Sequence, residues 1–128
     1  MKAQHIAWVL RIIASSILLQ TLWFKFTGAP ESIYIFSILG VEPYGRIGTG
    51  IVELIVAILI LIPRTTWLGA IGGCGVMSGA ILSHLFVLGI EVKGDGGLLF
   101  GLALITLICC LGLLYMNRNR IFNLLNIK

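Results

Sequence analysis

The sequence predicts an all-α membrane protein, an antiparallel bundle of four transmembrane helices with a short extra helix in the first outer loop. Hydrophobic residues make up 59% of the 128 residues and charged residues only 11%, whereas soluble domains carry about 25% charged residues. The mean hydropathy is +1.07. Four apolar runs approach or exceed the roughly 20 residues that a helix needs to cross a hydrocarbon core. Lipid must therefore be the solvent for much of this chain, and we expect a lipid bilayer as its first partner.

The four apolar runs form a single membrane domain over residues 1–128, and helix-breaking residues mark their ends. Pro63 ends the second run, because proline cannot continue a helix, and Gly94, Gly96 and Gly97 separate the third from the fourth. The predicted transmembrane helices cover residues 6–24, 46–62, 67–89 and 98–115.

Two further segments lie outside the predicted spans. Residues 30–39 form an interfacial helix, since Pro30 suits a first helical position, Glu31 suits the positive helix end and Gly40 suits a stop. The tail, residues 116–128, mixes Arg and Asn with apolar residues, which is typical of a segment lying on the inner leaflet.

The basic residues indicate the orientation. The segments at one side of the bundle hold no acidic residue, and their basic residues are Lys2, Arg64, Arg118, Arg120 and Lys128. The opposite loops mix both signs, with Lys25, Arg46, Lys93, Glu31, Glu42, Glu91 and Asp95. The positive-inside rule therefore places both termini and the 63–66 turn in the cytoplasm. Basic residues scattered at the ends of apolar runs do not form a nucleic-acid-binding patch, so we expect no nucleic-acid partner.

The three cysteines, Cys74, Cys109 and Cys110, all lie inside apolar runs. Without a Cys-x-x-Cys pair, the sequence contains neither a thioredoxin-like motif nor a zinc site, and we predict no metal centre. We expect free thiols that act as small packing residues.

Charged groups in a bilayer cost a few kcal/mol each, so the intramembrane polar residues are the candidate functional residues. Counting helical rise from the predicted helix ends places Arg11 and Glu53 about 6 Å apart in depth, close enough to pair; alternatively, Arg11 extends to the inner headgroups. A mid-membrane carboxylate cannot reach water easily. Glu53 is therefore paired, protonated or lining a polar cavity, and it is a candidate catalytic residue.

Gln20 and His84 share the outer half of the predicted bundle with Lys25. His84 is either a packing residue or a second catalytic candidate that carries a proton or contacts a ligand. Arg11, Gln20 and Lys25 are the candidate ligand-binding residues, although Gln20 can equally form a helix–helix hydrogen bond. At about 100° per residue, Arg11 shares its helix face with Lys25, while Gln20 points to the opposite side.

Glycines spaced four apart allow helices to approach closely, within a bundle or between protomers. Three such pairs occur, Gly69/Gly73, Gly75/Gly79 and Gly97/Gly101, and they raise the possibility of a homo-oligomer.

The order of these features resembles the DoxX-like family of small bacterial membrane proteins, whose relatives include the DoxD subunit of thiosulfate:quinone oxidoreductase. The similarity spans residues 10–115 and rests on Arg11, the Phe24-Lys25-Phe26-Thr27-Gly28 and Ile38-Leu39-Gly40-Val41-Glu42-Pro43 stretches, Gly50-Ile51-Val52-Glu53-Leu54, Ile62-Pro63-Arg64 and His84. The resemblance implies a four-helix bundle in the bacterial inner membrane, linked either to quinone or thiol redox chemistry or to assisting partner proteins.

Two functions follow from these expectations. In the first, the chain is an accessory subunit of a redox assembly that binds a quinone; Glu53 relays a proton, Arg11 sets its charge and Gln20 or His84 contacts the ligand. The chain has no haem-binding or dinucleotide-binding motif, so a partner would supply the redox centre and the chain would not be an enzyme by itself. In the second, it is a scaffold or chaperone for a membrane or periplasmic partner. Small-solute transport is less favoured, because broken helices and internal repeats are missing from the sequence.

Overall fold

The computed structural model describes residues 2–92 and 94–126, which are almost entirely helical. The helices in chain order are α1 (Lys2–Thr27), α2 (Pro30–Ile38), α3 (Tyr44–Leu61), α4 (Thr66–Ser83), the π-helical turn η1 (His84–Leu88), α5 (Leu98–Met116) and α6 (Arg118–Asn126). Four of these segments, α1, α3, α4 with η1, and α5, are long and apolar enough to cross a membrane. The predicted all-α four-helix bundle with a short helix after the first span is confirmed.

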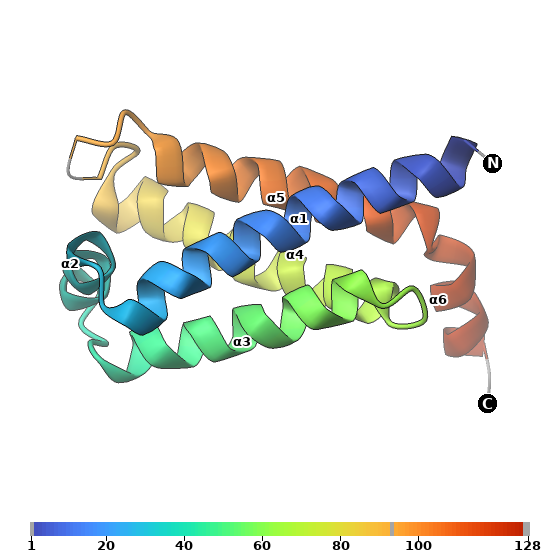
Figure 1. Ribbon diagram of the computed structural model, residues 1–128, viewed down its shortest axis with the longest axis horizontal. Helices are drawn as coiled ribbons and strands as arrows, with labels where there is room; N and C mark the ends of the chain where they lie inside the picture. Colours follow the sequence, from blue (N-terminus) through green and yellow to red (C-terminus); the bar gives the residue numbers. More distant parts are fainter. Residues whose placement is uncertain (1, 93, 127–128) are drawn as a thin grey trace.

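The four long helices form a ring in which each contacts two neighbours (Figure 1). Both α1 and α4 pack against α3 and α5. The chain ends and the turn between α3 and α4 lie at one end of the bundle, which we name the terminal end, and α6 crosses that end. Helix α2 and the loop residues 89–92 and 94–97 lie at the opposite end, which we name the α2 end. Large apolar side chains such as Trp23, Phe86 and Ile108 are exposed around the ring, as lipid contact requires.

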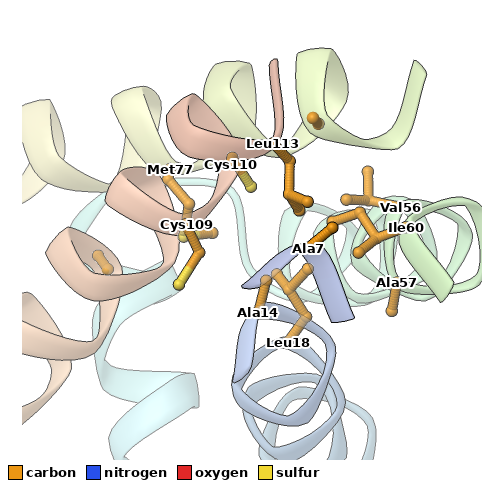
Figure 2. Close-up of a cluster of buried hydrophobic side chains, with 12 residues drawn as sticks. Ala7, Ala14, Leu18, Val56, Ala57, Ile60, Met77, Cys109, Cys110 and Leu113 are labelled. Atoms are coloured by element: carbon orange, nitrogen blue, oxygen red, sulfur yellow. The ribbon is translucent and has the colours of Figure 1, made fainter. Parts of the chain in front are cut away.

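The apolar core consists largely of small side chains (Figure 2). Ala14, Ala57 and Cys110 are completely buried, and side chains of this size let the helix backbones approach closely. Leu18, Val56, Ile60 and Leu113 fill the spaces between the helices, and all four are buried. Because Ile60 and Leu113 lie near the ends of α3 and α5, this tight packing extends to the terminal end.

Two glycines of α4 explain how closely the helices approach there. A Cβ added at Gly69 would lie 2.7 Å from the Ile60 backbone nitrogen, and one added at Gly73 would lie 2.5 Å from the Cys110 sulfur. This part of the predicted glycine pattern therefore serves packing inside one chain. The other pairs contain glycines that meet no neighbour in this chain, and the homo-oligomer stays a prediction.

Arg11 links α1 to the turn between α3 and α4. Its Nε donates a hydrogen bond to the Thr66 hydroxyl at 3.1 Å, and its guanidinium lies 4.7 Å from the Trp8 ring centre. The predicted pair between Arg11 and Glu53 is wrong. Arg11 lies level with the start of α4, and Glu53 is eight residues above the end of α3, which is about 12 Å of helical rise. The prediction took the ends of the helices as level, whereas Arg11, nine residues into α1, lies beside Thr66 at the first residue of α4.

The cysteines are free in this structure; Cys109 and Cys110 are buried and Cys74 is half-buried. Whether the thiols stay reduced in the cell remains a prediction. Within residues 2–92 and 94–126, no group of three His, Cys, Asp or Glu side chains is arranged to hold a metal ion.

Asp95 organises the loop that leads into α5. Its Oδ1 accepts hydrogen bonds from the Val92 and Gly97 amides at 3.0 and 2.8 Å, and its Oδ2 accepts one from the Leu99 amide at 3.2 Å. Burial raises the pKa of Asp95, but these three bonds, together with the nearby His84, outweigh burial and lower it below its usual value. The ionised carboxylate therefore stabilises the start of α5.

Replacing Asp95 with alanine should cost about 1 kcal/mol of stability at neutral pH, the usual effect of removing a helix cap. The pKa of Asp95 is lower in the folded protein than the value of about 3.9 in the unfolded chain. The stability that the ionised carboxylate contributes is therefore complete above about pH 3.9 and is lost as the pH falls through the pKa of the folded protein. Thermal unfolding in detergent should therefore separate wild type from variant at pH 7, and the gap should shrink below about pH 4. A constant gap across this range would show that the carboxylate charge is not involved.

Candidate functional site

The α2 end of the bundle encloses a cavity of about 720 Å³. Residues of all five helices α1 to α5 line it together with η1, and most are apolar. Leu18 and Met77 line the cavity and also belong to the apolar core, so the cavity begins where the core ends. The polar residues in the lining are Thr21, Lys25, Ser32, Thr49, Glu53, Ser83 and His84. A mostly apolar cavity of this volume with a few polar groups is typical of a small-molecule site.

Lys25 and Glu53 form an ion pair in this cavity. The Lys25 ammonium lies 3.2 Å from Glu53 Oε1, and the two side chains are 15% and 4% exposed. The Thr21 hydroxyl donates to the same oxygen at 3.3 Å. Thr21 and Lys25 are one turn apart on α1, so both face α3, where Glu53 lies in the middle of the helix. Lys25 therefore extends into the bundle rather than toward the loop.

This arrangement leaves hydrogen-bonding capacity unused. Among the described residues, the partners of the Glu53 carboxylate are the Lys25 ammonium, which has three protons to donate, and the Thr21 hydroxyl. A carboxylate can accept about four hydrogen bonds, so these two donors leave part of its capacity free. Both Lys25 and Glu53 line the cavity, so this remaining capacity is available to a molecule inside it. A ligand in the cavity can accept a bond from Lys25 and donate one to Glu53.

His84 is placed in the cavity wall by the π-helical turn that ends the third span. Its side chain is 5% exposed and packs edge-on against Phe100, with ring centres 5.5 Å apart. Nδ1 lies 3.0 Å from the Gly89 carbonyl oxygen, which only accepts, so a neutral ring carries its proton on Nδ1. The other nitrogen, Nε2, is then an acceptor for a ligand.

Arg46 supports the ion pair from outside the cavity. It is buried at the start of α3, where its Nε donates to both Glu42 carboxylate oxygens at 3.0 and 3.1 Å. Its Nη1 donates to the carbonyl oxygen of Lys25. Arg46 thus fixes the end of α1 against α3 and positions Lys25. Sequence reasoning did not assign it a role, although the four-residue spacing from Glu42 is a signal for such a pair.

The structure brings three of the five predicted site residues together. Lys25, Glu53 and His84 line the same cavity. Arg11 lies at the terminal end on Thr66. Gln20 is exposed and is not part of the lining, because it points to the side of α1 opposite the bundle interior.

Sequence reasoning also missed Thr21. Its position one turn before Lys25, on the same helix face, was the available signal.

The chain was compared with models of known protein families. The model described as the DoxX-like family matches residues 9–111, most of the chain. All the cavity-lining residues, from Leu18 to Ala103, lie inside the matched region. No curated protein and no solved structure matches the sequence.

Proposed function

The chain belongs to the DoxX-like family, and we propose that it is an accessory membrane subunit of a redox assembly that binds a quinone in the cavity at the α2 end. The observation that carries this proposal is the unused hydrogen-bonding capacity of the Lys25–Glu53 pair inside a largely apolar cavity of about 720 Å³. A quinone head combines an apolar ring with two polar oxygens, which is the chemistry that such a site recognises.

A bound quinone supplies two-electron, two-proton chemistry. In this proposal the Lys25 ammonium donates a hydrogen bond to a ligand oxygen, and the Glu53 carboxylate and the His84 ring accept the protons when a hydroxyl form is oxidised. The electrons pass to a redox centre on a partner protein, since the sequence has no haem-binding or dinucleotide-binding motif. The chain therefore contributes binding and proton transfer, and the partner contributes the electron carrier.

Binding of decylubiquinone to the protein in lipid nanodiscs tests this function. Glu53→Gln should weaken binding about 10- to 100-fold, because a hydrogen bond to a charged group contributes about 1.5–3 kcal/mol. Gln20→Leu, an exposed residue of α1 outside the cavity, is the control and should bind as wild type does. Absence of saturable binding by wild type, or equal binding by Glu53→Gln, would contradict the proposal.

A second candidate function is a scaffold or chaperone for a membrane or periplasmic protein. The observation in its favour is the apolar surface of the α2 segment, where Ile33, Ile38 and Val41 are exposed. This function predicts that Ile38→Ser releases a co-purifying partner and that Glu53→Gln does not. The quinone function predicts instead that Glu53→Gln weakens quinone binding and that Ile38→Ser leaves it unchanged.

The proposed setting is the bacterial inner membrane with both termini in the cytoplasm, which places the cavity in the periplasmic half. We expect alkaline phosphatase fused after Lys128 to be inactive, because the enzyme needs the periplasm. A fusion in the loop at Gly94 is the matched control and should be active. An active C-terminal fusion would show that the orientation is opposite to the predicted one.

A further inference from the structure

Helices α3 and α4 approach each other near their connecting turn and diverge toward α2 (Figure 1). Near the turn, a Cβ added at Gly69 would clash with the backbone of Ile60, and one added at Gly72 would lie 3.1 Å from Val56. Toward α2 the situation changes. At Gly48 of α3, and at Gly75 and Gly79 of α4, an added Cβ would meet nothing within 4 Å.

These three glycines line the cavity and are also exposed. Gly48 lies 13 residues before Leu61, and Gly79 lies 13 residues after Thr66, so the two sit at about the same height, roughly 20 Å from the turn. Neither has a side chain to fill the space between the diverging helices. The cavity is therefore continuous with the outer surface of the bundle between α3 and α4, at a depth that lies within the membrane.

The α1–α3 contact is closed close to the height of the opening, and the α1–α5 and α4–α5 contacts are closed nearer the terminal end. Between α1 and α3, a Cβ at Gly50 would lie 2.7 Å from Phe26. Between α1 and α5, one at Gly112 would lie 3.0 Å from Leu10, and between α4 and α5, one at Gly73 would lie 2.5 Å from Cys110. Helix α2 lies over the end of the cavity and contributes Ile35 and Phe36 to its lining, and its C-cap residue Leu39 also lines the cavity. Of the glycines that line the cavity, Gly48, Gly75 and Gly79 are the ones with no atom near an added Cβ, and all three lie on α3 and α4.

We infer that the opening bordered by Gly48, Gly75 and Gly79 is a lateral portal to the bilayer, and that the ligand is an amphiphile whose apolar tail occupies it. This inference rests on the proposed function and specifies the ligand class. The head binds at Lys25 and Glu53, where hydrogen-bonding groups are available. A cavity of about 720 Å³ holds a drug-sized molecule, so a long prenyl tail must extend through the portal into lipid.

The test compares a quinone without a tail, duroquinone, with a polyprenyl ubiquinone, each bound to the full chain in nanodiscs. Gly79→Leu places a side chain in the portal; it should weaken binding of the polyprenyl ubiquinone about 10-fold or more and change duroquinone binding less than about 2-fold. Gly101→Leu is the matched control. Its Cβ also meets nothing within 4 Å, but Gly101 does not line the cavity, and neither affinity should change.

The possible outcomes distinguish a failure of the portal proposal from a failure of the proposed quinone-binding function. If Gly79→Leu binds the polyprenyl ubiquinone as wild type does, the portal is wrong and the quinone site stands. If it loses both ligands equally, the substitution disturbs the cavity itself, and the portal is again wrong. If cross-linking shows that Gly79→Leu separates a dimer, the glycine pair is a contact between protomers and not a portal. If wild type binds neither quinone, the proposed function fails and the inference fails with it.

Discussion

Replacing Lys25 with methionine should lower the free energy of unfolding by about 3–5 kcal/mol, because it leaves the Glu53 carboxylate without its cation inside the bundle. Glu53→Leu should also destabilise the protein, since it strands the ammonium group. The double variant Lys25→Met/Glu53→Leu should recover part of the loss, because no buried charge is left alone. Thermal unfolding of the four proteins in detergent measures the coupling between the two residues.

Arg11 provides the matched control for this cycle. It is a second buried cation, but its side chain bonds to Thr66 and lies about 12 Å of helical rise from Glu53. The losses caused by Arg11→Leu and Glu53→Leu should therefore add, as expected for sites without a shared partner. Strong coupling of Glu53 to Arg11, combined with simple additivity of Lys25 and Glu53, would contradict the ion pair and restore the pairing that the sequence predicted.

Gly69→Ala should destabilise the bundle by about 1–3 kcal/mol, the usual cost of overpacking a well-packed core. The added methyl group would lie 2.7 Å from the Ile60 backbone nitrogen and 2.9 Å from the Leu59 Cβ, and backbone atoms cannot move aside as a flexible side chain can. The loss outweighs the roughly 1 kcal/mol by which alanine favours a helix over glycine. A lower midpoint of thermal unfolding in detergent is the expected measurement.

Gly101→Ala is the control for this substitution. It is a glycine of α5 with no atom within 4 Å of an added Cβ, so the change should be neutral or should stabilise the helix by up to about 1 kcal/mol. Equal losses at Gly69 and Gly101 would show that the close approach of α3 and α4 at Ile60 does not limit stability.

The sequence predicted which helix face each candidate residue occupies, but not which cation pairs with Glu53. Helical periodicity correctly placed Lys25 and Arg11 on the same side of the first helix and Gln20 on the other. The depth of each residue relative to another helix depends on where each helix begins, and the sequence marks helix ends only to within a few residues. The start of α1 extends past the turn between α3 and α4, so Arg11 lies level with Thr66 and Lys25 is the cation that reaches Glu53.

The sequence by itself determined the four spans, the helix of the first outer loop and the intramembrane position of Glu53, because hydropathy, helix breakers and charge act locally along the chain. Only the tertiary structure decided that Lys25 is the partner of Glu53, that His84 faces the same cavity and that α3 and α4 diverge at Gly48 and Gly79. These properties depend on the relative heights and angles of helices far apart in sequence. Packing of the whole bundle sets those heights and angles, and no local pattern encodes them.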